Sequence, residues 1–243
     1  MIRIENTGVY GFEAAIRGMR NPMNSWEKSD SKYCSEYDHP PIEGSCQYCP
    51  YDNMCNKSEK AMQQMYLVGY NDLDLMRRLR NAGTDHRKFM RMITVYLDIN
   101  APLYWWKEFD TYKVGTVVNS CSTMHKIHAK EFDVNDFSHE HVEELTGDDY
   151  NMSCDFLLRT VDILNYYRKK FLETNVKTYW WQLIQLLPSS YNQRRTVMLN
   201  YEVLTNIYKS RRSHKLDEWH TFCDWIEELP YSELITNNGN EEL

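Results

Sequence analysis

The stretch from Asp98 to Lys126 has the clearest potential for ligand chemistry. An extended run ends at Ala101-Pro102, and an apolar, aromatic block follows it as far as Phe109. Closely spaced amides, hydroxyls and basic groups come next: Lys113, Thr116, Asn119, Ser120, Ser122, Thr123 and His125. A phosphate or nucleotide pocket needs many short hydrogen bonds from a rigid support. The composition of this segment therefore predicts such a pocket.

Four of the seven cysteines lie close together in the chain and could bind a metal. They are spaced Cys34-x11-Cys46-x2-Cys49-x5-Cys55, and His39 in the same loop could replace one of them. Four thiolates joined by short loops suit a tetrahedral zinc ion or an iron–sulfur cluster. The odd number of cysteines argues against a disulfide framework. We predict a structural metal site, with a loop of free cysteines as the alternative.

Composition and charge limit the class of protein. The chain has 243 residues, of which 26% are charged, so one large globular domain is favoured. A net charge of −7 argues against general nucleic-acid binding, because phosphate neutralisation needs a basic surface. No apolar run approaches the roughly 20 residues that cross a bilayer, and the start MIRIENTG is not a signal peptide. We expect a cytoplasmic protein.

The hydrophobic pattern predicts that a mostly helical α+β chain positions these residues. Strands are expected at the start of the chain and at Ile93–Tyr96. An acidic surface stretch is expected over 131–150. Helices are expected over Phe12–Met19, from a cap at Asn71 to Gly83, near 154–173, over 195–210 and over 215–228.

Two blocks, roughly Gly83–His125 and Leu187–Trp219, resemble the flavin-dependent thymidylate synthase family, also called thymidylate synthase complementing proteins. In that family a strand, an Ala-Pro break and a helix lead into the signature RHRxxSxNExSxRY. Ala101-Pro102 keeps this lead-in, and one inserted residue around Val117-Val118 aligns the rest. The signature's third basic residue, first Ser, Asn and second Ser then fall near Lys113, Thr116, Asn119 and Ser122. In the second block the family's spacing is kept without a gap at Pro188, Asn200, Asn206 and Arg211.

The resemblance implies the α+β fold of this family, formed by residues 1–243 as a single domain with a Cys-rich insertion at about 27–60. It implies flavin-dependent methylation of dUMP or a related pyrimidine nucleotide. FAD would be the cofactor, and methylenetetrahydrofolate and NADPH the co-substrates. It also implies a homo-oligomer, a tetramer by resemblance, because the family builds its sites between subunits.

Functional residues can be carried over position by position. Ser122 would help to hold the nucleotide phosphate, and Arg211 would lie over the pyrimidine and stabilise charge that builds on the ring. No enzyme nucleophile is required in this family, so the protein supplies positioning and electrostatics. The candidates for flavin contacts are Arg87, Lys113, Thr116, Asn200 and Asn206.

Several charged positions of the signature are neutral in this chain. Charge-assisted bonds to phosphate are the strong ones, so their loss should weaken dUMP binding by about 1.5–3 kcal/mol each unless other basic residues substitute. The positions that differ are Thr111 and Tyr112 for the first Arg and His, Ser120 for Glu, Met124-His125 for the final Arg-Tyr, and Ile184 for an arginine before Leu-Pro. The candidates to compensate are Lys126, Lys130, Arg194 and Arg195.

Two alternatives to a flavin-dependent methylating enzyme remain open at this point. One is a non-catalytic, diverged protein that binds a nucleotide or flavin on the same scaffold and carries a structural metal site. The other is an iron–sulfur protein of unrelated function, which rests on the cysteines alone.

Overall fold

The computed structural model describes residues 2–34, 50–51 and 65–237. No helix in this part of the chain is both long and apolar enough to cross a bilayer. The strands are β1 (Arg3–Tyr10), β2 (Lys32–Tyr33), β3 (Tyr66–Leu67), β4 (Thr94–Pro102), β5 (Val117–Ser120) and β6 (Asn192–Asn200). The α-helices are α1 (Phe12–Arg20), α3 (Tyr70–Asn81), α4 (Leu103–Phe109), α5 (Gly147–Thr174), α6 (Lys177–Gln185), α7 (Tyr201–Arg211), α8 (Asp217–Glu227) and α9 (Glu233–Thr236). The 3₁₀ helices are η1 (Asn21–Met23), η2 (Trp26–Lys28), η3 (Arg87–Met92), η4 (Val134–Asp136) and η5 (Glu140–Glu144).

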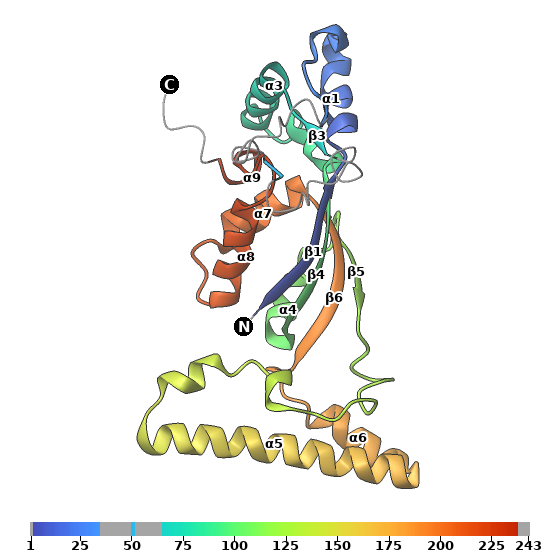
Figure 1. Cartoon of the computed structure of the whole chain (residues 1–243), viewed down its shortest axis with the longest axis vertical. Coiled ribbons are helices and arrows are strands. Elements are labelled where there is room, and N and C mark those ends of the chain that lie inside the picture. Colours follow the sequence, from blue (N-terminus) through green and yellow to red (C-terminus); the bar gives the residue numbers. More distant parts are fainter. Residues whose placement is uncertain (1, 35–49, 52–64, 238–243) are drawn as a thin grey trace, which may run out of the picture. The chain divides into compact units, whose positions relative to one another are not determined.

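Four strands form an antiparallel sheet in the order β1-β4-β6-β5, and β2 pairs with β3 in a separate ladder (Figure 1). The chain divides into two compact units, and it passes from one to the other within each of the four strands of the larger sheet and once more after α4, between Thr111 and Tyr112. That residues 1–243 form a single domain stays a prediction. Unit 1 comprises the start of the chain to Ile4, Asp98–Thr111 and Val118–Thr196, and unit 2 comprises Glu5–Leu97, Tyr112–Val117 and Val197–Leu243, as far as these are described.

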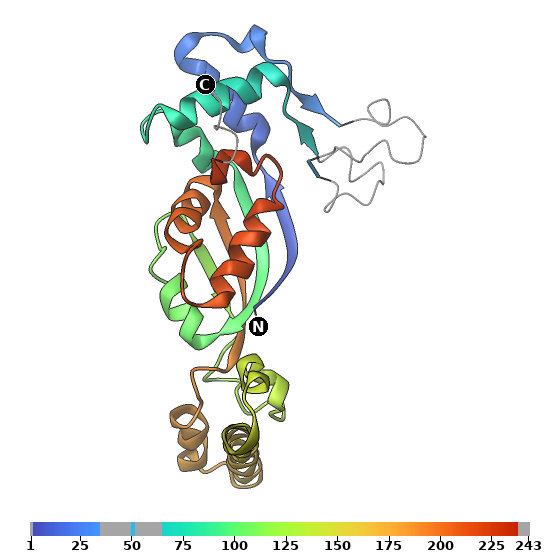
Figure 2. The same cartoon turned by 90° about the vertical axis from the view of Figure 1, so that its left-hand side faces the viewer.

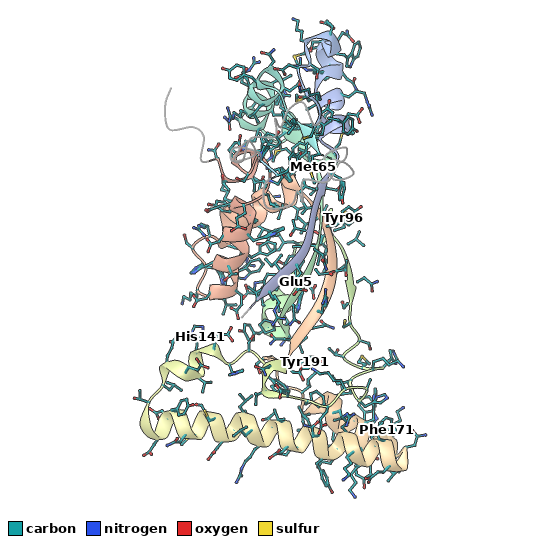
Figure 3. The ribbon with its side chains drawn as sticks, viewed as in Figure 1. Glu5, Met65, Tyr96, His141, Phe171 and Tyr191 are labelled. Atoms are coloured by element: carbon teal, nitrogen blue, oxygen red, sulfur yellow. The ribbon has the colours of Figure 1, made fainter. Side chains whose placement is uncertain are left out.

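The core of unit 1 includes a cluster at the helices α5 and α6, which pack side by side (Figure 1). Leu164 of α5 and Leu183 of α6 are fully buried in it. Phe171, near the end of α5, places its ring 4.9 Å from that of His128 (Figure 3). The apolar stripe expected on this helix is therefore confirmed, although α5 begins earlier than expected, at Gly147.

The aromatic block that follows Ala101-Pro102 forms α4, which bonds to the backbone at the start of β6. Trp106 is fully buried, and its Nε1 donates a hydrogen bond to the backbone oxygen of Gln193 at 2.9 Å. The first N–H groups of a helix lack partners within it. Here the N–H of Leu103 finds the backbone oxygen of Tyr191, which lies just before β6 (Figure 3), at 3.0 Å. The block thus supports the start of the strand.

A buried ion pair joins α1 and α3 in unit 2. Arg20 is 4% exposed and Asp72 is fully buried, and Nε of the arginine lies 2.6 Å from Oδ1 of the carboxylate. The second carboxylate oxygen accepts hydrogen bonds from the hydroxyls of Ser29 and Ser31. Arg20 also donates to the backbone oxygen of Lys28. Both carboxylate oxygens of Asp72 and the guanidinium of Arg20 therefore have hydrogen-bond partners within the protein.

The expected cap of α3 is wrong. Asn71 lies within the first turn, and the carboxylate of Asp30 accepts its N–H at 2.9 Å and that of Asp72 at 3.1 Å. Asp30 is 41 residues away from Asn71, so no local pattern could have shown it. The helix does end before Gly83, as expected.

The helix expected over 195–210 is wrong in its first part, because β6 continues to Asn200 and α7 begins at Tyr201. Burial in β6 follows the alternation of a strand, with Val197 and Leu199 buried. Helices α7, α8 and α9 pack against one another in unit 2 (Figure 2). The predictions of α1, of a strand over Ile93–Tyr96 and of α8 are confirmed.

Replacing Asp72 with Asn should lower the free energy of unfolding by about 3 kcal/mol, because Arg20 is left buried without its counter-charge. Burial alone would raise the pKa of Asp72, but hydrogen bonds from Ser31, Ser29 and Arg20 hold it below its ordinary value. The stabilisation is therefore present above about pH 4 and is lost as the pH falls further, so the two proteins should converge in acid. Urea titrations across this pH range measure the difference.

The matched control is Asp74→Asn in the same helix. Asp74 pairs with Arg78 at 3.0 Å, but its side chain is 49% exposed. Surface pairs contribute less than about 1 kcal/mol. An Asp72→Asn effect as small as that of the control would contradict the structural role of the buried pair.

Candidate functional site

The first turn of α7 contacts the segment Lys113–Thr116, which contains two of the predicted flavin contacts. Asn200 caps the helix: its side-chain oxygen accepts the N–H of Val203 at 3.1 Å, and its Nδ2 donates to the backbone oxygen of Gly115 at 3.5 Å. Gly115 has φ +79°, and a Cβ there would lie 2.9 Å from Asn200 Nδ2 and 3.2 Å from Val203 Cγ2. Glycine suits this position because it adopts a positive φ without strain and has no Cβ to collide with Asn200 and Val203. Thr116 directly follows Gly115, and Lys113 lies two residues before it.

Thr116 has a buried hydroxyl that finds no hydrogen-bond partner within the described part of the chain. Buried polar groups are normally satisfied, and leaving one unpaired costs about 1–3 kcal/mol. A polar atom of a ligand at this position would satisfy the hydroxyl. Lys113, in contrast, has an exposed side chain.

Glu202, in the same turn of α7, brings two arginines of η3 to the site. Its buried carboxylate forms hydrogen bonds with Arg91, which raise the pKa of that arginine above its ordinary value. Nε of Arg87 lies 3.5 Å from the carboxylate and is buried without a hydrogen bond among the described residues. An acidic residue in the first turn is also favoured by the helix dipole. Glu202 and Arg91 were not identified from the sequence, since their pairing spans 111 residues.

Arg91 lines a cavity of about 810 Å³ in unit 2. The volume is typical of a pocket for a cofactor or a drug-sized molecule. Methionine side chains adapt to flat ring systems, and basic groups attract phosphate. The lining combines apolar side chains, among them Met19, Met23, Phe89 and Met92, with the basic Lys88 and Arg91, and it also contains His86 and the acidic Asp85.

Arg211, at the end of α7, lies against aromatic side chains. Its Nε donates a hydrogen bond to the hydroxyl of Tyr112 at 2.9 Å. The guanidinium carbon is 4.8 Å from the ring centroid of Trp219 and 5.6 Å from that of Tyr112, within the range of cation–π attraction. Asn206 is on the same helix with an exposed side chain. Unit 2 therefore holds Arg211 and all five predicted flavin contacts.

Ser122 lies in unit 1, in the turn after β5. Its hydroxyl oxygen accepts the N–H of Met124 at 3.2 Å and the N–H of His125 at 2.8 Å. The hydroxyl can still donate its own hydrogen. Its role in holding a phosphate stays a prediction.

Three of the four basic residues expected to compensate for lost arginines are paired with carboxylates within unit 1. Lys130 pairs with Asp136 at 2.9 Å, Arg194 with Asp98 at 2.8 Å and Arg195 with Asp110 at 2.7 Å. Arg195 also stacks over the ring of Trp106, 4.2 Å from its centroid. Their charges are thus balanced locally, and their compensation for the lost arginines stays a prediction.

The predicted metal site falls mostly outside the described residues, as Cys46, Cys49 and Cys55 do. Cys34 is buried after β2, and its N–H donates to the backbone oxygen of Met65 at 2.8 Å. Within residues 2–34, 50–51 and 65–237 no group of three or more His, Cys, Asp or Glu side chains could hold a metal ion. The metal site stays a prediction.

Comparison with solved structures identifies the fold. Thymidylate synthase X (ThyX) from Helicobacter pylori, solved with FAD and dUMP, superimposes with a TM-score of 0.62 over 98% of this chain and 98% of its own, at 15% identity. The UMP/dUMP methylase PolB from Streptomyces cacaoi, bound to 5-Br dUMP, gives a TM-score of 0.60 over 98% and 96%, at 13% identity. No family model and no curated protein matches the sequence. The chain therefore has the flavin-dependent thymidylate synthase fold, which confirms the expected α+β class.

Replacing Thr116 with Val should leave the free energy of unfolding unchanged or raise it, because the hydroxyl has no protein partner to lose. The matched control is Thr205→Val: the Thr205 hydroxyl is also buried but donates to the backbone oxygen of Tyr201 at 2.8 Å. That variant should lose about 1 kcal/mol. Chemical denaturation measures both, and a larger loss at Thr116 would show that its hydroxyl is satisfied by the protein.

If the cysteine cluster binds metal, the purified protein should contain zinc or iron, and Cys34→Ser should lower the metal content because one thiolate ligand is removed. Elemental analysis by mass spectrometry measures this before and after a chelator is added. Cys121→Ser, at an exposed cysteine outside the cluster, should have no effect. A metal-free wild-type protein, purified without oxygen, would refute the metal site.

Proposed function

We propose that this chain binds FAD and a pyrimidine nucleotide, dUMP or a close relative, and methylates the pyrimidine ring. Methylenetetrahydrofolate is the carbon donor and NADPH the reductant. The observation that carries the proposal is the buried, unpartnered hydroxyl of Thr116, beside the capped first turn of α7. The fold supports it, because the solved structures that share the fold are a thymidylate synthase with FAD and dUMP and a UMP/dUMP methylase.

The chemistry of unit 2 suits FAD. FAD combines flat, largely apolar ring systems with two phosphates, and its reduced form supplies hydride. The methionine-lined cavity offers an apolar surface, and Lys88 and Arg91 of η3 bring basic groups to its lining beside the carboxylate of Asp85. Thr116 and Asn200 add hydrogen-bonding groups near the same turn of α7. These residues account for binding and orientation of the cofactor.

Arg211 is proposed to contact the nucleotide. The guanidinium is held between a hydroxyl and an indole ring, so its direction is set before a ligand arrives. A pre-positioned positive charge stabilises negative charge that develops on the pyrimidine during reaction. Ser122 is proposed to donate its hydroxyl hydrogen to the nucleotide phosphate.

We also propose that the protein acts as a homo-oligomer, a tetramer by analogy with the family. One face of the long helix α5 exposes large apolar side chains that a second subunit could cover. Met152 and Phe156 are each 71% exposed, and Ile163 and Tyr166 continue the stripe at helical spacing.

A second candidate is a protein that binds FAD or a nucleotide on this scaffold without turnover. It is favoured by the ion pairs of Arg194 and Arg195 with Asp98 and Asp110, which balance charges that a phosphate would otherwise use. Binding without a methylated product would support this candidate.

The test is to supply FAD-loaded protein with dUMP, methylenetetrahydrofolate and NADPH and to measure the methylated nucleotide by mass spectrometry. Arg211→Ala should lower kcat/KM about 100-fold, the value of one strong charge-assisted bond. The adjacent Arg212→Ala is the matched control, because Arg212 pairs on the surface with Asp224 and Glu227. A wild-type chain that binds neither FAD nor dUMP would contradict both candidates.

A further inference from the structure

Tyr112 is one of the residues at which this chain departs from the family signature, and its hydroxyl accepts a hydrogen bond from Arg211. We propose that Tyr112 is a positioning residue for Arg211. It fixes the guanidinium against Trp219, so that the arginine meets a pyrimidine nucleotide in one orientation. The inference rests on the proposed function, in which Arg211 contacts the nucleotide.

Two contacts restrain the guanidinium of Arg211, a hydrogen bond at its edge and an aromatic ring over its face. The hydrogen bond from Nε to the Tyr112 hydroxyl, 2.9 Å long, holds the edge. The indole of Trp219, 4.8 Å from the guanidinium carbon, covers a face. The rings of Tyr112 and Trp219 meet edge to face, with centroids 6.1 Å apart and planes at 71°. The two aromatic side chains thus form a corner that holds the arginine.

The two aromatic side chains are themselves fixed. Trp219 is fully buried, and its ring contacts those of Phe222 and His214 edge to face. Tyr112 begins the segment whose glycine, Gly115, packs against the cap of α7. Because α7 also carries Arg211, one helix sets the positions of both ends of the hydrogen bond.

Arg211 and its neighbour Arg212 have different surroundings at the end of α7, because Arg212 pairs with the carboxylates of Asp224 and Glu227. A planar guanidinium that is already oriented loses less freedom when it binds a ligand. Tyr112 therefore contributes to affinity through Arg211, without needing to touch the nucleotide.

The test compares Tyr112→Phe with Tyr208→Phe. Both remove only a hydroxyl, and the hydroxyl of Tyr208, one turn earlier on α7, donates a hydrogen bond to Glu227 at 2.6 Å. Calorimetric titration with dUMP should show about tenfold weaker binding for Tyr112→Phe, as expected for one bond to a charged group, and an unchanged constant for Tyr208→Phe. In turnover the same loss should appear as a raised KM for dUMP.

A double-mutant cycle separates positioning from a direct contact. In an Arg211→Ala background, Tyr112→Phe should cause no further loss of dUMP affinity. Equal affinity of Tyr112→Phe and wild type, or the same tenfold loss with and without Arg211, would overturn the inference.

The NMR signal of the Arg211 Nε–H group tests the restraint without any ligand. In the wild type the Nε–H signal should be resolved and slow to exchange, and in Tyr112→Phe it should shift and exchange faster, because the hydrogen bond to the Tyr112 hydroxyl is lost. If the wild type fails to bind dUMP, the proposed function fails and the signal alone decides the restraint. A signal unchanged by Tyr112→Phe overturns the positioning role in either case.

Discussion

The close approach of Gly115 to the first turn of α7 is the contact on which the candidate site depends. A side chain at this position would meet Asn200 and Val203, and φ +79° already disfavours one. The contact places the turn that carries Thr116 and Tyr112, and through Tyr112 it reaches Arg211. The same turn of α7 carries Glu202, which holds Arg87 and Arg91. The start of α7 therefore contacts residues proposed to bind the cofactor and, through Tyr112, the arginine proposed to bind the nucleotide.

One neutral replacement in the signature, Tyr112, has a structural role in this arrangement. Tyr112 has no charge to offer a phosphate, but it restrains an arginine that has one. The ion pairs of η3 with Glu202 keep positive charge beside the cavity, where it remains balanced until an anionic ligand competes for it. Binding of an anionic ligand by this chain would thus depend more on the fixed orientation of a few arginines than on the number of basic residues.

The features that could be predicted from the sequence are those that depend on local residue patterns or on the family signature. The stripe of α5 and the strand that ends at Ala101-Pro102 follow from periodicity and a helix-starting break. The residues Thr116, Asn200 and Arg211 were identified by resemblance, and the structure groups them in unit 2. The missed features depend on partners distant in sequence: Asp30 as the cap of α3, Glu202 as the partner of Arg91, and Trp219 beneath Arg211. Residues 195–200 of β6 were expected to be helical because the apolar residues of this strand are few, and only burial shows its alternation.

FAD binding by the purified chain, measured as fluorescence quenching in a titration, decides whether this fold holds a flavin. We expect saturable, equimolar binding by the wild type and weaker binding by Thr116→Val, whose fold is retained but whose buried hydroxyl is gone. A wild-type chain that shows no saturable binding of FAD would contradict the proposed flavin binding.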